Sequence, residues 1–89
     1  MTTETTARCA VDVTAPAGLH ARPAAAIAAA AARFRSDIQL HHDGREADAK
    51  SVLLLLTLDV REGAHVVITA QGPDADEAVA ALARLVESP

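Results

Sequence analysis

The chain has 89 residues, which gives room for one domain with one modest core. Its formal net charge is −4 and its eight Lys and Arg residues form no cluster, which argues against nucleic acid or an acidic membrane surface as the partner. Half of the residues are apolar, yet there is one Phe and no Trp or Tyr, so the core must consist of Ala, Val, Leu and Ile.

Other features predict the compartment in which the chain works. Cys9 is the only cysteine, so no disulfide forms within the chain and a reducing compartment is compatible with it. Residues 1–8 are polar and rich in Thr, unlike the apolar segment of a signal peptide. The leucine run at 52–56 is far too short to span a bilayer. We therefore expect a soluble protein of the cytoplasm that does not insert into membranes.

The first predicted element is a strand. Cys9, Val11 and Val13 alternate with other residues, which is the period-2 pattern of a strand with one buried face. Cys9 then packs in the core as a small apolar residue. Residues 15–18, Ala-Pro-Ala-Gly, end this strand because proline and glycine favour turns.

A helix follows this turn. Residues 24–34 are almost entirely alanine, which has the highest helix propensity. Pro23 is compatible only with the first turn, where its missing N–H removes no helical hydrogen bond. The helix is therefore predicted to begin at about His20 or Ala21, and Gly18 lets the incoming backbone turn without a Cβ clash.

A hairpin and a short helix are predicted in the middle of the chain. Residues 38–41 alternate as a strand, and the Asp-Gly pair at 43–44 is a turn signal that leads into a short polar edge strand over about 45–49. Periodicity alone does not separate a buried strand from a helix over 52–58. Ser51 favours the helix, because a serine directly before a leucine run is a good N-cap.

Such a short helix can bury only one of its sides. We expect Leu55 and Leu58 to be buried, and Val52, Leu53 and Leu56 to be partly exposed. An exposed apolar patch on so small a protein marks a surface for a partner. The alternative interpretation is that the whole segment is buried.

The last two predicted elements are a strand over 66–70 and a helix over 74–86. Alternation of apolar residues predicts the strand. Asp74 and Glu77 have the spacing of a capping box at the start of the helix. The apolar stripe of this helix is formed by Val79, Leu82 and Val86.

The candidate functional site is the stretch 18–23, Gly-Leu-His-Ala-Arg-Pro. His20 would lie at the N-cap, beside amide N–H groups that have no intrahelical acceptor. A phosphoryl group on its ring would meet these donors, the positive end of the helix dipole and the guanidinium of Arg22. Since the motif is short, the alternative is that His20 merely caps the helix and Arg22 merely solvates it.

The residues give little support to other chemistry. His41 and His42 are adjacent in a strand and point to opposite faces, so they cannot chelate one metal ion together with His65. His20 has no Ser or Cys partner, which argues against hydrolysis. We therefore expect no metal, no cofactor and no enzyme activity. A small regulatory domain that binds a small molecule and a structural or adaptor domain stay open as alternatives.

Two motifs occur together in this chain: Gly-Leu-His-Ala-Arg-Pro-Ala-Ala at 18–25 and Ala-Lys-Ser at 49–51. With both, the chain resembles the HPr family, the histidine phosphocarriers of the bacterial phosphoenolpyruvate-dependent phosphotransferase system. Residues 63–70 fall where the family has its fourth strand. Because the match covers about 8–86, we expect residues 1–89 to form a single phosphocarrier domain with that core.

The predicted order of elements suits an α+β domain with helices on one face of a mainly antiparallel sheet. The resemblance makes this prediction more specific. It implies the family's open-faced β-sandwich, with the element order β-α-β-β-α-β-α. The four antiparallel strands would have the order 1-4-2-3, with three helices on one face.

The resemblance also implies roles for single residues. His20 matches the position that takes a phosphoryl group on Nδ1 from phospho-enzyme I and passes it to an enzyme IIA domain of a sugar transporter. Arg22 matches the arginine beside that phosphate, and the backbone amides of Ala21 and Arg22 match its anion-binding groups. Ser51 matches the serine on which a regulatory kinase and phosphorylase act in some bacteria.

We expect enzyme I and enzyme IIA domains to be the partners and the carrier to be a monomer. The partner-docking surface is predicted to consist of Lys50, Val52, Leu53 and Leu56.

In two places the chain departs from the sugar-pathway members of the family. The first helix carries alanine at positions such as Ala26, Ala29 and Ala32, where those members often have polar or basic residues. Asp59 and the leucine-rich segment 52–58 resemble the nitrogen-related branch, in which the phosphate chain ends at a regulatory protein. A regulatory phosphocarrier of that branch is therefore an alternative to a carrier for sugar uptake.

Overall fold

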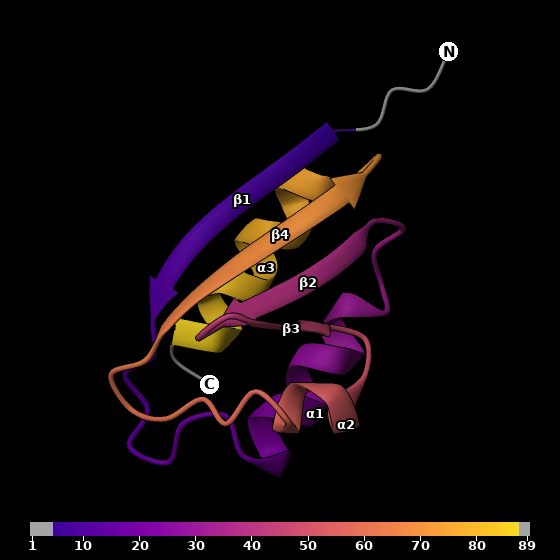
Figure 1. The fold of residues 1–89 in the computed structure, drawn as a ribbon. Coiled ribbons are helices and arrows are strands. Elements are labelled where there is room, and N and C mark those ends of the chain that lie inside the picture. The colour runs from indigo at the N-terminus through magenta and orange to yellow at the C-terminus, as the bar shows by residue number, and fades with distance from the viewer. Residues whose placement is uncertain (1–4, 88–89) are drawn as a thin grey trace.

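The computed structural model describes residues 5–87, which form a four-stranded antiparallel sheet with three helices on one of its faces (Figure 1). The strand order is β1-β4-β2-β3, so the predicted open-faced sandwich is confirmed. The elements are β1 (Thr5–Asp12), α1 (Ala21–Ala31), β2 (Asp37–His42), β3 (Arg45–Asp48), α2 (Val52–Leu56), β4 (His65–Gly72) and α3 (Ala75–Glu87).

The core lies between the sheet and the helices. Ile68 of β4 is at its centre, where it pairs with Cys9 of β1 on one side and with Leu40 of β2 on the other. Cys9 packs against this core as predicted, but it is only half-buried because β1 is an edge strand. The largest side chains that are fully buried are Ile27, Ile38, Leu40, Leu55, Leu58, Ile68 and Leu82.

The predicted burial of the helices is largely confirmed. Val79, Leu82 and Val86 form the buried stripe of α3, and Leu55 and Leu58 anchor the segment of α2. Within residues 5–87, no helix has both the length and the apolar character that crossing a membrane requires.

A two-residue turn joins β2 to β3. Asp43 and Gly44 both have positive φ, 51° and 80°, as a type I′ hairpin turn requires. His42 and Arg45 are cross-strand partners next to this turn. The strand β3 lies at the edge of the sheet, as its polar sequence predicts, and it ends at Asp48.

The start of α1 agrees with the sequence prediction, but its end does not. The helix ends at Ala31, although the alanine-rich segment predicts a helix to Phe34. The amides of Arg33 and Phe34 donate to carbonyls three residues earlier, both at 3.1 Å, which tightens the last turn. The chain then turns toward the start of α3, where Asp74 holds it.

Asp74 joins the end of this turn to α3. Its carboxylate accepts hydrogen bonds from the backbone N–H of Arg35 and Ser36, both at 3.0 Å, and from the Ser36 hydroxyl at 2.6 Å. Asp74 directly precedes α3, as predicted, and its carbonyl accepts from the Ala78 amide at 2.9 Å. The predicted capping box with Glu77 does not form, because the carboxylate oxygens of Asp74 receive donors from a distant segment. Ser36 is the buried polar residue in this part of the structure.

These hydrogen bonds lower the pKa of Asp74. The bond from the Ser36 side chain has the largest effect, and the bond from the Arg35 backbone has the next largest. A carboxyl with a lower pKa in the folded chain stabilises the fold above its ordinary pKa of 3.8, and this stabilisation is lost as the pH falls through the folded value. We expect Asp74→Asn to lower the free energy of unfolding at neutral pH. We also expect this free energy to fall less steeply in the variant as the pH is lowered. Urea unfolding between about pH 5 and pH 2 measures this dependence.

Asp76 offers a matched control for this prediction. It is exposed in the first turn of α3, and within residues 5–87 its carboxylate receives no hydrogen bond from another element. In Asp76→Asn, the free energy of unfolding should therefore change with pH as it does in the wild-type chain. Equal effects of the two substitutions would show that general charge, and not the bonds to Asp74, sets this dependence.

Candidate functional site

His20 occupies the N-cap position of α1, as the sequence predicts. Its backbone is extended, with φ −89° and ψ −172°, and its exposed side chain makes no capping hydrogen bond. A histidine that served only as a helix cap would direct a ring nitrogen at the amides of the first turn. The geometry therefore argues against the simple capping role, and the ring is accessible from solvent.

The loop before His20 is held against the segment that follows α2. Gly18 has φ +64°, and a Cβ atom there would overlap the Val60 carbonyl oxygen and lie 2.8 Å from the Cα of Arg61. The next residue, Leu19, is buried and donates its N–H to the Val60 carbonyl at 3.0 Å. This packing requires glycine at position 18 and fixes the backbone that leads into His20.

The first turn of α1 offers two free backbone donors. The amide of Ala24 donates to the His20 carbonyl at 3.0 Å, which is the first helical hydrogen bond. Pro23 has no N–H, so Ala21 and Arg22 carry the amides without an intrahelical acceptor. Since the first turn of α1 contains no acidic residue, no carboxylate there offsets the positive end of the helix dipole. This end of α1 therefore suits an anion beside the His20 ring.

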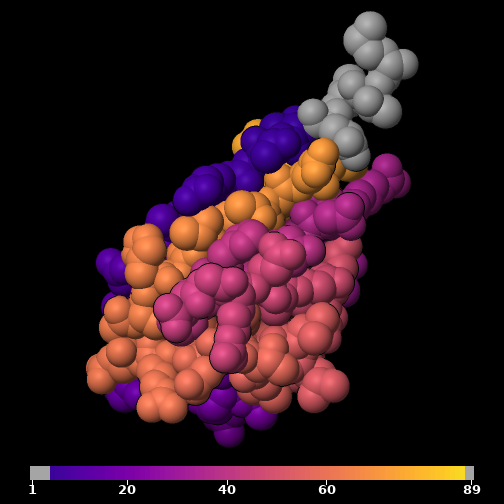
Figure 2. Space-filling view, viewed as in Figure 1, coloured from indigo at the N-terminus to yellow at the C-terminus, as the bar shows by residue number. Residues whose placement is uncertain are grey.

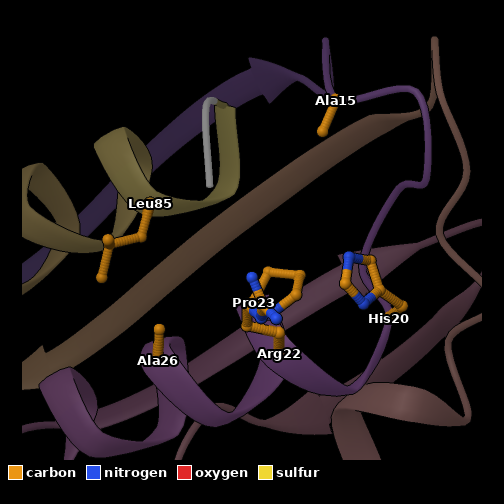
Figure 3. A pocket seen from close by; sticks show the side chains of 6 residues that line it. All are labelled: Ala15, His20, Arg22, Pro23, Ala26 and Leu85. Atoms are coloured by element: carbon orange, nitrogen blue, oxygen red, sulfur yellow. The ribbon is translucent and has the colours of Figure 1, made fainter.

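His20 and Arg22 face the same shallow depression, which has a volume of ≈ 350 Å³ (Figure 3). Leu85 of α3 extends toward α1 from the other side of this depression. The sequence analysis missed Leu85, because only the packing of α3 against α1 brings a residue from the end of the chain to this site. The lining residues are Ala15, His20, Arg22, Pro23, Ala26 and Leu85.

A second candidate surface lies on α2. The exposed fractions of its side chains are 37% for Val52, 74% for Leu53, 45% for Leu54 and 38% for Leu56, whereas Leu55 is fully buried. We call the four exposed residues the α2 patch. The sequence analysis expected three of them; Leu54 is also exposed because a one-turn helix can direct only one residue straight into the core. The alternative of a fully buried segment is wrong.

The start of α2 is fixed by Ser51 and Lys50. Ser51 is the N-cap residue, as predicted, and its Oγ accepts a hydrogen bond from the Leu54 amide at 3.2 Å. Lys50 donates from Nζ to the Phe34 carbonyl at 3.1 Å. This bond connects the residue before α2 with the turn after α1, and the two helices lie side by side in Figure 1.

The other histidines lie apart from His20. His41 and His42 point to opposite faces of the sheet, as expected for adjacent strand residues: His41 Nε2 is 2.9 Å from Thr69 Oγ1, and His42 Nδ1 is 2.9 Å from the Leu58 carbonyl oxygen. His65 Nδ1 is 2.9 Å from an Asp12 carboxylate oxygen. Each of these three rings already has a partner within the chain.

Comparisons with known proteins agree with this geometry. The family described as "PTS HPr component phosphorylation site" matches residues 7–88. The HPr-like protein Crh of Bacillus subtilis and the phosphocarrier protein HPr of Vibrio cholerae are each 44% identical to this chain over 77 residues, which is 86% of this chain and 91% of each relative. The crystal structure of HPr from Bacillus anthracis has a TM-score of 0.86 and 40% identity, and covers 91% of this chain and 96% of that one.

The fold and the comparisons together place the chain among the HPr-like proteins of the phosphotransferase system. The chain belongs to the HPr family. Members of this family carry phosphoryl groups and are not enzymes in the usual sense.

Proposed function

We propose that this chain accepts a phosphoryl group on Nδ1 of His20 from phospho-enzyme I and passes it to an enzyme IIA domain. The observation that carries this proposal is the exposed His20 ring at the N-cap of α1, which makes no capping bond and lies beside two free amides. In the acceptor step, a lone pair of Nδ1 attacks phosphorus while the bond between phosphorus and the donor breaks. In the donor step, a nucleophile of the enzyme IIA domain attacks phosphorus, the bond between phosphorus and Nδ1 breaks, and its electron pair returns to the free ring.

The site suits a carrier because it can stabilise a phosphate without enclosing it. The amides of Ala21 and Arg22 and the Arg22 guanidinium would bind the phosphate oxygens from one side. The opposite side stays open to solvent and to partner proteins, since His20 and Arg22 are both exposed. A buried site with more cations would hold the phosphate too firmly for onward transfer.

Incubation of the chain with enzyme I and phosphoenolpyruvate tests the proposal. We expect one acid-labile phosphate per chain, which then moves to an added enzyme IIA domain. A chain that gains no phosphate from active enzyme I, while a known HPr in the same assay is phosphorylated, would contradict the proposed function. A structural or adaptor domain and a domain that binds a small molecule would both give that negative result.

Arg22 is expected to support transfer more than folding. Its side chain is exposed in the first turn of α1. Arg22→Ala should slow phosphoryl transfer on the order of tenfold, because a charged donor to the phosphate is lost. Its free energy of unfolding should change by no more than about 0.5 kcal/mol.

Arg33→Ala is the control for this prediction, since Arg33 is exposed just beyond the other end of α1. It should leave the rate of transfer unchanged in rapid-quench measurements. A large loss of stability in Arg22→Ala at an unchanged transfer rate would show that the arginine is structural.

We further propose that the α2 patch and Lys50 dock the partner proteins. Leu53→Gln should weaken binding to enzyme I by about 5–30-fold, as one lost apolar anchor in an interface does, while it leaves the fold intact. Calorimetric titration measures this change. Ala10→Gln, on the exposed face of β1, is the control and should bind as the wild type does.

Ser51→Asp tests the same surface and the proposed regulation at Ser51. Aspartate is also a good N-cap, so α2 should stay formed, while a negative charge is added at the edge of the α2 patch. We expect weaker binding to enzyme I, through the cost of burying this charge against an apolar partner surface. Unchanged affinity for Ser51→Asp and Leu53→Gln alike would show that the partners dock elsewhere.

We expect the chain to act as a monomer in the cytoplasm, where a sugar transporter receives its phosphate. A regulatory HPr-like role is the second candidate, because Crh of Bacillus subtilis is as similar to this chain as the HPr of Vibrio cholerae is. The leucine-rich segment 52–58 and Asp59 resemble the nitrogen-related branch and favour a further candidate, a regulatory phosphocarrier of that branch. Transfer from the phosphorylated chain to a sugar-specific or to a regulatory enzyme IIA domain separates these functions.

A further inference from the structure

The short helix α2 packs against α1 and β3, and hydrogen bonds connect the residues on both sides of it to the rest of the fold. The helix has five residues, which is too short for a helix to be stable by itself in water. Only Leu55 within it is buried, so the remaining side chains do little to fix its direction. Its first turn is held by Ser51, whose Oγ accepts from the Leu54 amide.

The segment that directly follows α2 is held by the β2–β3 hairpin. Within the last turn, the carbonyls of Leu54, Leu55 and Leu56 accept from the amides three residues later. The next two carbonyls bond to the hairpin: that of Thr57 accepts from Arg45 Nη1 at 3.2 Å, and that of Leu58 lies 2.9 Å from His42 Nδ1. A carbonyl oxygen can only accept, so Nδ1 of His42 carries the proton of this bond.

The two-residue turn of the hairpin places the two donors, His42 and Arg45, side by side. Because the loop has two residues, His42 and Arg45 are cross-strand partners, and their side chains leave the sheet on the same face. His41 and Glu46, the next pair, leave on the opposite face, where His41 bonds to Thr69. In Figure 2 the magenta surface of the hairpin adjoins the coral surface of α2.

We propose that His42, assisted by Arg45, is a positioning residue that holds α2 in the orientation in which the α2 patch meets a partner. The half-buried ring joins the sheet to Leu58, two residues after the helix, and Ser51 caps the start of the helix. The inference rests on the proposed docking role of α2. It assigns a part in partner recognition to a residue that does not itself belong to the α2 patch.

The two adjacent histidines make a matched pair for testing this inference. His41 and His42 are both half-buried, and each makes one hydrogen bond of 2.9 Å. His41 Nδ1 also lies 3.6 Å from the Glu46 carboxylate, but only His42 bonds to the segment that follows α2. His42→Ala should raise the KM of enzyme I for this chain about three- to tenfold, with kcat nearly unchanged, as the loss of one hydrogen bond implies. His41→Ala should leave KM unchanged. The melting temperature of each variant shows whether it is folded at the assay temperature.

His42→Asn is the conservative variant. The amide nitrogen of asparagine is as many bonds from Cα as Nδ1 of histidine is, so it can donate to the Leu58 carbonyl and should restore most of the wild-type KM. Equal increases of KM in His42→Ala and His41→Ala, or no increase in either, would overturn the inference. Failure of His42→Asn to improve on His42→Ala would overturn it too.

Hydrogen exchange of the free chain gives a readout that needs no enzyme I. The amides of Leu55, Thr57 and Leu58, which donate to carbonyls of residues 51, 54 and 55, should exchange faster in His42→Ala than in His41→Ala. Equal exchange in the two variants would overturn the inference. If the wild-type chain takes no phosphate from enzyme I, the proposed function fails, while this exchange result still decides whether His42 holds α2.

Discussion

His20→Ala is expected to lose all phosphorylation by enzyme I and to keep its fold. The side chain is exposed and makes no capping bond, so its removal breaks no contact that stabilises α1. Alanine has no nitrogen that could attack phosphorus, and no other residue lies at the same position relative to the two free amides. Incorporation of labelled phosphate from phosphoenolpyruvate measures the loss, and circular dichroism measures the fold.

His65→Ala is the control for this loss, because His65 is also an exposed histidine. It lies at the start of β4, where its ring contacts Asp12. This variant should take up phosphate at the wild-type rate. Label that persists in His20→Ala would place the acceptor on another residue and would contradict the assignment of His20.

Gly18→Ala is expected to lower the free energy of unfolding by about 2–4 kcal/mol, more than any of the other substitutions proposed above. Two costs add at this position: the left-handed backbone at φ +64° and the overlap of a Cβ atom with the Val60 carbonyl. Because domains of this size unfold with a free energy of about 5–15 kcal/mol, the variant should still fold at low temperature. Its melting temperature should fall by about 10–20 °C.

Gly63→Ala separates the two costs. Gly63 has a left-handed backbone too, with φ +85°, but no atom lies within 4 Å of the place where a Cβ would be. It should lose only about 1 kcal/mol, which is the cost of the backbone conformation alone. Gly18→Ala should also slow phosphoryl transfer where it is folded, because Leu19 and His20 must shift. Equal losses in the two variants would show that the close approach to Val60 has no energetic importance.

The start of α1 and the character of α2 could be predicted because their causes are local. Pro23 restricts where α1 begins, and Ser51 directly precedes the leucine run that it caps. In the same way, the Asp-Gly pair at 43–44 predicts the turn between β2 and β3, which these two residues form. Each of these signals lies within a few residues of the structure that it determines, so it can be recognised without knowledge of the fold.

Features that depend on distant residues could not be predicted. The turn after α1 is held by Asp74, whose carboxylate accepts from the amides of Arg35 and Ser36, almost 40 residues away in the chain. The spacing of Asp74 and Glu77 also fits a capping box, but the donors that the Asp74 carboxylate binds instead become visible only in the fold. Leu85 reaches the His20 site for the same reason, through the packing of α3 against α1.

The two adjacent histidines also combine one feature that the local sequence predicts with another that depends on the fold. Alternation along β2 predicts that His41 and His42 point to opposite faces, which the structure confirms. The partners themselves, Thr69 for one ring and the Leu58 carbonyl for the other, depend on how strands and helices pack. The sequence therefore predicts on which face a side chain lies better than it predicts what that side chain contacts.

Nitrogen-15 NMR of the phosphorylated chain, labelled in its histidine rings, tests the central claim most directly. After incubation with enzyme I and phosphoenolpyruvate, we predict that Nδ1 of His20 shifts and shows a coupling to phosphorus, while the rings of His41, His42 and His65 stay unmodified. A phosphate on Nε2, on one of the other three rings, or on no histidine at all would contradict the account.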